Sequence, residues 1–538
     1  MGTTEAVKRD LESLGSQTFD VVVVGCGIHG VSIARDATLR GLKVAAIDMG
    51  DVSGETSHNS LKTIHGGIRY LQHFDFKRSR ESINEQRYLL RNAPHLVHPL
   101  PFLMPTYGHG MRGPLAMFAG IRLYELLGID RNRGLAEESR LKRGRILSSE
   151  QCLGHAPDIN SENLTGGAVW DDAQVGHANK ASLQILTHAV ENGAIVANHV
   201  RAESLLIDNN RCTGVSVVDA LGEATPFQIS ARHVVNATGP WAASWATKAS
   251  EDKVTLDLPL TRSLNLVTRL PATDTAVGFE SRQASDSKIG TTKRLFFAVP
   301  WNGRTMIGTA HMPDGAGGPE ATLANTSDNK KELAASVDEF LREINEARPS
   351  LNLTTDDVLY CYQGLTPAED ESSSYVSRSR EGRVVDHTHE DGLSNLTSPL
   401  GIKWTTARLI AERTVDIVCQ TLGNNTACVT HRTPLPDDED LLYSTRDLSD
   451  QDVEKYCHAH LEATMAASLT DMVLRRNEDL VAGYMTFETL SLIARTMSKE
   501  LGWSSTDQQR ELADLQKRWL PSEITASLKQ GQLWSSDS

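Results

Sequence analysis

The sequence predicts an α/β protein of two or three domains, with a parallel sheet near its start and a helical C-terminal region. The main observation is the segment "FDVVVVGCGIHGVSIARDATLRGLKVAAIDMG" at 19–50. It has the pattern of a buried parallel strand, a glycine turn, a helix and a second strand that ends at Asp48. The second observation is length, because 538 residues are too many for one ordinary hydrophobic core.

Composition narrows the class of protein. With 39% hydrophobic and 23% charged residues, the chain has the composition of a soluble globular protein. A formal net charge of -15 argues against a nucleic-acid partner and against attachment to anionic lipid by charge alone. The seven cysteines are scattered without a C-x-x-C pair, which favours reduced thiols, a cytoplasmic location and no metal site.

One apolar stretch leaves two interpretations open. The segment "GPLAMFAGIRLYELLGI" at 113–129 is too short to span a bilayer, which takes about 18 residues. It is compatible with a helix lying on a membrane surface, and we expect instead a buried helix.

The glycine turn predicts a dinucleotide site. Gly25, Gly27 and Gly30 form G-x-G-x-x-G: the first allows the tight turn, the second lets the backbone approach a pyrophosphate, and the third lets the helix pack on the strand. The helix start at Ile28 then offers free N–H groups to the phosphates. Asp48, about 20 residues further on, is placed to accept hydrogen bonds from ribose hydroxyls.

The loop "TSHNSLKTIHGGIRYL" at 56–71 favours a flavin over a nicotinamide dinucleotide. Instead of further alternating strands and helices, the chain runs into an extended polar segment whose glycine pair lets backbone N–H groups approach a flat ring. The candidate flavin contacts in this loop are Thr56, Ser57, Ser60, Lys62, His65, Gly66 and Gly67.

Two later segments are expected to return to the same site. A meander at 199–220 precedes the buried strand "HVVNATG" at 233–239, whose end lies where open α/β sheets bind ligands. The segment "SNLTSPLGIKWTTARLIAE" predicts a strand, a glycine turn and a helix from about Thr405, whose positive end would face the flavin. The candidate cofactor contacts here are Ala237, Thr238, Gly239, Trp241, Gly401, Lys403, Trp404 and Thr405.

These segments resemble the FAD-dependent glycerol-3-phosphate dehydrogenases, within the D-amino-acid-oxidase-like flavoproteins. The specific stretches are "HGGIRYL" and "VNATGPW". The segment "GIKWTTARLIAE" also matches, and "TDMVLRRNEDL" resembles the tail of the family less specifically. The resemblance implies a Rossmann-like FAD-binding domain, an α+β substrate domain with an antiparallel sheet, and a helical C-terminal domain. We expect the FAD-binding domain at 18–75, 150–255 and 365–425, the substrate domain at 76–149 and 256–364, and the helical domain at 435–538.

The resemblance also implies a reaction. In the family, the secondary alcohol of a small polyol phosphate loses a hydride to flavin N5, and the electrons usually pass to a quinone at the membrane. Basic side chains hold the phosphate, since fixed cations suit a dianion. The matching positions are Arg69, Tyr70, Arg378 and Lys403.

Several positions depart from the pattern of the family. Thr366 stands where an arginine precedes a proline, Arg262 and Asn265 replace a lysine and a histidine, and Gln174 replaces an arginine. His311 stands in place of an aspartate. It is a candidate general base as well as a candidate neutral histidine. Arg262 would compensate for a lost cation if it faced the same pocket.

Three functions remain open at this stage. The first is oxidation of glycerol 3-phosphate or a related polyol phosphate. The second is oxidation of an unphosphorylated hydroxy or amino compound, with oxygen as acceptor. The third is non-catalytic dinucleotide binding, which the flavin loop argues against. A quinone or oxygen as acceptor, peripheral membrane contact and a homodimer are further expectations.

Overall fold

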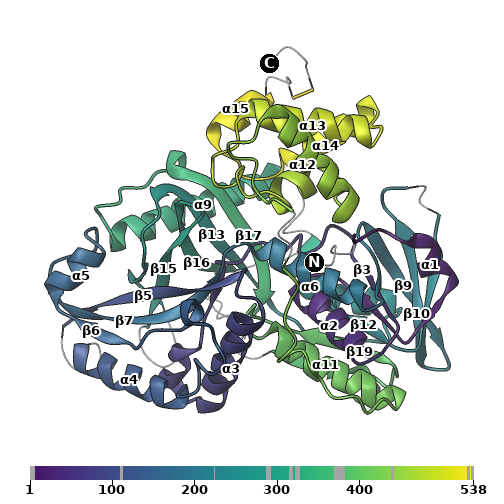
Figure 1. The fold of residues 1–538 in the computed structure, drawn as a ribbon, viewed down its shortest axis with the longest axis horizontal. Coiled ribbons are helices and arrows are strands. Elements are labelled where there is room, and N and C mark those ends of the chain that lie inside the picture. The colour runs from purple at the N-terminus through teal and green to yellow at the C-terminus, as the bar shows by residue number, and fades with distance from the viewer. Residues whose placement is uncertain are drawn as a thin grey trace.

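The computed structural model describes residues 6–108, 113–222, 225–285, 292–313, 319–320, 327–368, 382–437, 441–529 and 533–534. Within these ranges the strands form three sheets, and the last part of the chain is helical (Figure 1). The predicted α/β class, with an antiparallel second sheet and a helical C-terminal region, is confirmed.

The sheet predicted from the glycine turn has six strands in the order β18-β19-β12-β2-β3-β8. The strand β2 (Val21–Val24) is fully buried and lies between β12 (Val234–Asn236) and β3 (Val44–Ile47), both parallel to it. The remaining strands are β8 (Ile195–Ala197), β19 (Leu396–Leu400) and the antiparallel edge strand β18 (Arg383–Asp386). The helix α2 (Ile28–Leu39) packs between α6 (Ala178–Glu191) and α11 (Ala407–Leu422).

A small sheet of four strands is the predicted meander. The strands β9 (Val200–Asp208) and β10 (Arg211–Asp219) are antiparallel, and they join at Asn209 and Asn210. Both asparagines have left-handed backbones, at φ 48° and 57°, as a tight hairpin turn of this twist requires. The other strands are β11 (Phe227–Ala231) and β1 (Thr18–Phe19), and nearby helices are α1 (Leu11–Ser16) and α7 (Ala242–Ala249).

The third sheet has nine strands, most of them antiparallel. Their order is β17 (Val358–Pro367), β13 (Leu260–Pro271), β16 (Arg304–Pro313), β15 (Thr292–Trp301), β14 (Ala276–Ser285), β5 (Val97–Tyr107), β7 (Leu164–Val175) and β4 (Thr63–Ile64), with β6 (Arg145–Leu147) beside β7. The strands β4 and β7 lie inside the ranges expected for the FAD-binding domain. The sheets therefore divide the chain differently from the expected ranges.

Helices border this sheet, and one of them corrects a prediction. They are η1 (Ile68–His73), α3 (Phe76–Asn92), α4 (Pro114–Leu127), α5 (Ser149–His155) and α9 (Ser327–Ala347). We expected α4 to be buried, and this was wrong: Leu115 is 84% exposed and Leu126 67%. The helix is largely apolar apart from Arg122 and Glu125, but only Ile121 and Tyr124 are buried, because its neighbours α3, η1, β6 and β7 cover one side.

The C-terminal helices lie across the top of Figure 1, above both the nine-stranded and the parallel sheet. They are α12 (Asp450–Ala463), the π-helical turn η7 (Asp471–Arg475), α13 (Phe487–Glu500), α14 (Ser505–Leu515) and α15 (Ser522–Lys529). Their apolar faces share one buried cluster with Leu359 of β17 and Val267 of β13. Every helix in the described ranges is too short or too polar to span a bilayer.

Candidate active site

A cavity of about 1760 Å³ lies between the carboxyl ends of the parallel strands and the nine-stranded sheet. Its volume exceeds the roughly 300–1,000 Å³ of most small-molecule pockets, so it has room for a dinucleotide as well as a substrate. The predicted residues that line it are Gly25, Gly27, Ile28, Asp48, Thr56, Ser57, Ser60, His65, Gly67, Arg69, Tyr70, Ala237, Thr238, Gly239, Trp241, Asn265, His311, Thr366, Gly401, Lys403, Trp404 and Thr405.

The glycine turn has the geometry that its spacing predicts. Gly25 has φ +103°, and a Cβ there would lie 2.5 Å from the Ala237 carbonyl oxygen. A Cβ on Gly30 would lie 1.8 Å from the Gly25 carbonyl oxygen, so this glycine allows the helix to pack on the strand from behind the cavity. At the helix start, Ile28 N–H donates to Ser57 Oγ at 2.9 Å.

Asp48 is held by the backbone at the end of β3. Its carboxylate accepts the Cys26 N–H at 2.6 Å and the Gly50 N–H at 2.9 Å. Burial raises the pKa of Asp48 to about 6, although these two hydrogen bonds oppose the shift. The carboxylate is therefore largely ionised at neutral pH and keeps lone pairs for hydroxyl groups of a ligand.

Some residues of the predicted flavin loop are already hydrogen-bonded to other parts of the protein. Thr56 lines the cavity, but its Oγ1 donates to the Leu365 carbonyl at 2.8 Å. The Gly66 N–H donates to Asp172 at 2.8 Å, and a Cβ on Gly66 would lie 1.7 Å from the Tyr124 hydroxyl oxygen. Gly66 is thus needed for packing against α4, and among the described residues it does not line the cavity.

Lys62 corrects a prediction, because its side chain is buried away from the cavity that the described residues enclose. Its Nζ donates to the His58 carbonyl and lies 4.3 Å from the centroid of the Tyr362 ring. Burial lowers the pKa of Lys62 to about 8, and the nearby Glu478 opposes that shift. The sequence of an extended loop does not reveal on which side each side chain lies.

Sequence reasoning missed Asp172, which holds the histidine of this loop. Asp172 is buried and accepts His65 Nδ1 at 2.9 Å and Gln86 Nε2 at 2.9 Å. Burial works to raise the pKa of Asp172, but the hydrogen bonds to His65, Gly66 and Gln86 outweigh it and lower the pKa. A carboxylate that fixes one ring nitrogen of a cavity histidine is a signal of function, and it lies two residues before Gln174, a position that the sequence had already singled out.

Three of the predicted catalytic residues lie together. The Lys403 Nζ lies 4.1 Å from the centroid of the Tyr70 ring. Burial, and then the positive charge of Arg69, lower the pKa of Lys403 to about 8. Arg69 and Lys403 therefore present two neighbouring cations to the cavity. Arg378, the fourth predicted residue, lies outside the described residues.

Another part of the cavity lining, the neutral wall, carries uncharged polar groups on β13, β16 and β17. Ser263 Oγ lies 3.0 Å from His311 Nδ1 and 3.2 Å from Thr366 Oγ1, so these three side chains form one chain of hydrogen bonds. Asn265 lines the cavity, but its amide is already used: it donates to the Asn59 carbonyl at 2.9 Å and accepts Thr309 Oγ1 at 2.8 Å.

Arg262 does not supply the missing cation, contrary to the suggestion from the sequence. Its guanidinium donates to Glu332 at 2.7 Å and to Ser336 at 3.0 Å, both on α9, and it is absent from the described lining of the cavity. Side chains alternate along a strand, so Ser263 and Asn265 face the cavity while Arg262 faces α9. Gln174 likewise binds protein, donating to the Pro300 carbonyl at 2.7 Å.

His29 is a second residue that sequence reasoning missed, although it lies inside the glycine fingerprint. It lines the cavity, and a Cβ on Gly401 would lie 1.8 Å from its Nε2. Burial lowers the pKa of His29 to about 4, so the imidazole is neutral. Among the described residues, His29 Nε2, Ser60 Oγ and Trp404 Nε1 are buried without a hydrogen-bond partner in this structure.

Comparison with known proteins agrees with this geometry. A family model described as FAD dependent oxidoreductase matches residues 20–417. A glycerol-3-phosphate dehydrogenase of Synechocystis is 31% identical over 86% of this chain and 82% of that protein. An aerobic glycerol-3-phosphate dehydrogenase of Bacillus subtilis is 29% identical over 76% of this chain and 68% of that protein.

Two solved structures show the same fold. A glycerol-3-phosphate dehydrogenase from Bacillus halodurans complexed with FAD has a TM-score of 0.69 at 24% identity and covers 95% of this chain and 97% of that chain. An L-α-glycerophosphate oxidase from Mycoplasma pneumoniae with FAD bound has a TM-score of 0.51 at 16% identity and covers 78% and 100%.

The residues present fit FAD. The cavity is large enough, and the glycine turn leaves its backbone open to a pyrophosphate. The helix α11 begins near the predicted Thr405, and its N-terminal residue Thr406 makes no side-chain capping bond. The Ala407 N–H donates to the Trp404 carbonyl at 3.1 Å, and the positive end of the helix is left to face a ligand. This chain belongs to the FAD-dependent oxidoreductase family, and FAD is its cofactor.

Proposed function

We propose that this protein oxidises the secondary alcohol of glycerol 3-phosphate, or of a related polyol phosphate, to a ketone. The observation that carries the proposal is the pair of cations, Arg69 and Lys403, on the wall of the flavin cavity. Two neighbouring cations on a cavity wall suit a ligand that carries a phosphate dianion. The names of the relatives from Synechocystis and Bacillus subtilis support the same substrate.

In this reaction the bound flavin supplies the two-electron acceptor for the hydride that leaves the substrate carbon. Arg69 and Lys403 bind the phosphate, Arg through its donor fork and Lys as a point charge. The Tyr70 ring under Lys403 keeps water from that side of the ammonium group. Arg378 is part of the same proposal through the resemblance alone.

The hydroxyl proton needs an acceptor, and the described lining of the cavity includes three histidines. His29, in the glycine fingerprint, packs against Gly401, and His65 and His311 are the candidates. We assign this role to His65, because the buried Asp172 fixes its Nδ1 and stabilises the imidazolium that forms. His65 Nε2 lies 3.0 Å from Thr63 Oγ1, a contact that the substrate hydroxyl would replace. His311 is the alternative base. Its Nδ1 bonds Ser263, which in turn contacts Thr366, so we assign His311 to recognition of a substrate hydroxyl group.

The first experiment is the visible spectrum of the purified protein without oxygen, before and after glycerol 3-phosphate is added. Bleaching of the flavin band supports the proposal, and the Arg69→Ala variant should keep the band but need a much higher substrate concentration to lose it. His65→Asn should slow bleaching much more than His311→Asn. A flavin band that glycerol 3-phosphate leaves unchanged would overturn the substrate assignment.

The neutral wall favours a second candidate. Thr366, Ser263 and His311 offer hydrogen bonds to a ligand but carry no fixed positive charge. Such a surface suits an unphosphorylated hydroxy or amino compound, with oxygen as acceptor. Bleaching by an unphosphorylated polyol or an amine, together with hydrogen peroxide formed in air, would favour this oxidase.

We also propose that electrons leave to a quinone at a membrane that α4 contacts. The exposed apolar residues Phe74, Leu115 and Leu126 lie on or next to this helix, and Phe74 and Leu123 also line the cavity. An exposed basic segment follows the helix: Arg133, Arg140, Lys142, Arg143 and Arg145. An apolar surface beside local cations suits an anionic bilayer, despite the net charge of the whole chain.

Cosedimentation tests this surface with phosphatidylcholine vesicles that contain or lack phosphatidylglycerol. The wild type should bind the anionic vesicles, and Leu115→Gln with Leu126→Gln should not. Leu442→Gln is the control, since Leu442 is exposed far along the chain in the C-terminal part. If the double variant only turns a dimer into a monomer in sedimentation velocity, the surface is instead the interface of a homodimer.

A further inference from the structure

A buried ion pair joins the C-terminal part of the chain to the loop that follows β3. The Asp51 carboxylate accepts Arg476 Nη1 at 2.6 Å and Arg476 Nη2 at 2.9 Å. Asp51 is 2% exposed and Arg476 is 1% exposed, although they lie 425 positions apart in the sequence. A two-pronged pair of this kind fixes orientation as well as distance.

Arg476 is itself held from the C-terminal side. Its Nε donates to Thr464 Oγ1 at 2.9 Å, and its Nη2 donates to the Thr464 carbonyl at 2.7 Å. On the other side, Asn198 at the end of β8 donates to Asp51 at 3.1 Å and to the Met465 carbonyl at 2.8 Å. Asp51 is thus fixed between the parallel sheet and the C-terminal helices.

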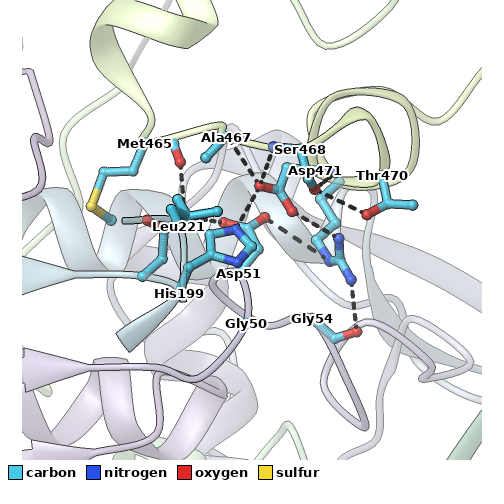
Figure 2. A network of polar contacts seen from close by, with 12 residues as sticks. Gly50, Asp51, Gly54, His199, Leu221, Met465, Ala467, Ser468, Thr470 and Asp471 are labelled. Atoms are coloured by element: carbon cyan, nitrogen blue, oxygen red, sulfur yellow. Dashed lines mark hydrogen bonds and ion pairs between the residues drawn. The ribbon is translucent and has the colours of Figure 1, made fainter. Parts of the chain in front are cut away.

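The neighbouring Arg475 extends the contact to Gly54. Its Nη1 donates to Asp471 at 3.2 Å, and its Nη2 lies 3.4 Å from the Gly54 carbonyl oxygen. Figure 2 shows Asp471 between the Ala467 and Ser468 N–H groups, both at 3.0 Å, and His199 Nε2 at 2.9 Å. The Arg475 end of this second contact is therefore fixed by Asp471.

The loop so held is part of the flavin site. Gly54 lines the cavity, and so do Asp48 and Ser57 on either side of it along the chain. Ser53 has a left-handed backbone at φ 57°, a conformation that a serine adopts only when its surroundings impose it. The loop alone would not keep this shape.

We propose that Arg475 and Arg476 are positioning residues for the flavin: through Gly54 and Asp51 they hold the loop after β3 in the shape that receives FAD. The affinity for FAD is then coupled to the C-terminal helices, which lie outside the matched range 20–417. The proposal concerns the cofactor only and does not depend on the identity of the substrate.

The test measures FAD affinity directly, by adding FAD to apoprotein and following flavin fluorescence. Arg476→Gln should raise the Kd for FAD about 10-fold to 100-fold, the usual effect of losing a group that orients a ligand-binding residue. Arg476→Lys should recover part of the loss, since it keeps the charge but not the fork. An unchanged Kd in Arg476→Gln overturns the proposal.

Arg446→Gln is the matched control. Arg446 lies in the same part of the chain, but it pairs with Asp479 at 3.2 Å and contacts Asn302 of the nine-stranded sheet at 3.1 Å. The Arg446→Gln variant should lower the melting temperature of the apoprotein without a change in the Kd for FAD. An equal rise in Kd in both variants would mean general loosening of the C-terminal part, and it would overturn the specific role.

A double-variant comparison tests the route through Asp51. If Arg476 acts through Asp51, the two substitutions should not add. The double variant Asp51→Asn with Arg476→Gln should then have a Kd for FAD no higher than that of the single variant with the higher Kd. Effects that multiply would show that Arg476 acts by another route, and this would overturn the proposal. If Arg476→Gln does not fold, the Kd for FAD is measured in Asp51→Asn instead, because asparagine keeps the size of the side chain. A raised Kd in this variant supports the proposal, and an unchanged Kd refutes it.

Discussion

The cofactor side and the substrate side of the cavity are built in different ways. On the cofactor side the backbone is the contact surface, because Gly25 and Gly27 carry no Cβ at the turn where α2 begins. On the substrate side the contacts are side chains from elements far apart in the sequence, such as His65, His311 and Thr366. The first side tolerates few sequences because it needs missing Cβ atoms, and the second can change its specificity one side chain at a time.

Filling the space at Gly30 should have the largest effect. Gly30→Val places atoms where a Cβ alone would lie 1.8 Å from the Gly25 carbonyl oxygen, so the turn must move and FAD binding should be lost. The check is the flavin absorbance of the purified protein. Gly154→Ala is the control, since Gly154 also lies in a helix and its Cβ would meet nothing within 4 Å. A yellow Gly30→Val protein would contradict the role of the backbone on this side.

Removing a cation from the substrate side should weaken substrate binding and leave the flavin bound. One charge-assisted hydrogen bond contributes about 1.5–3 kcal/mol, so Lys403→Gln should lower kcat/KM for glycerol 3-phosphate roughly 10-fold to 150-fold. The flavin spectrum should remain. Lys248→Gln is the control, because Lys248 is exposed at the margin of the same cavity.

The same lysine predicts a pH dependence. Burial and Arg69 lower the pKa of Lys403 to about 8, so the ammonium form is present below that pH and is lost above it. The KM of the wild type should therefore rise as pH increases through about 8, and this rise should be absent in Lys403→Gln. A rise of equal size in the variant would mean that another group titrates.

A smaller effect, on the stability of the folded protein, is expected at His199, which pairs with Asp471 beside the loop after β3. Burial works to lower the pKa of His199, but Asp471 raises it above the ordinary value. A raised pKa in the folded state stabilises the protein fully below the unfolded pKa of about 6.5, and this contribution is lost as pH rises through the folded pKa. The melting temperature of the wild type should exceed that of His199→Asn by more at pH 5.5 than at pH 8.5. An equal difference at both values would show that the charge does not matter.

The smallest effect on function is expected at Arg262. Since its guanidinium is bound to Glu332 and Ser336, Arg262→Met should leave the KM unchanged. Glu332 is 52% exposed and can return to water, so the loss of stability should be about 1 kcal/mol. Steady-state kinetics measure the KM, and urea unfolding measures the loss of stability. A raised KM would place Arg262 in the substrate site after all.

Much of the fold was predictable because its signals are local. The strand and turn around Gly25 and the Asn209-Asn210 hairpin depend on residues within a few positions of one another, as does the helix that follows Thr405. The exposure of α4 was not predictable, because an apolar segment carries no mark of which neighbours will cover it. The alternation along β13 could have shown that Arg262 and Asn265 face opposite sides of the sheet.

The sequence by itself determined the cofactor side of this protein. Glycine spacing, an apolar run and a carboxylate at the right distance encode a dinucleotide turn within about 30 residues. Only the tertiary structure decided which charged side chains face the cavity, turning Lys62 and Arg262 away from it and bringing Asp172 to His65. The physical reason is that a local pattern shows at most which side chains of a strand share a face, whereas the face that lines the cavity depends on register and packing with distant elements.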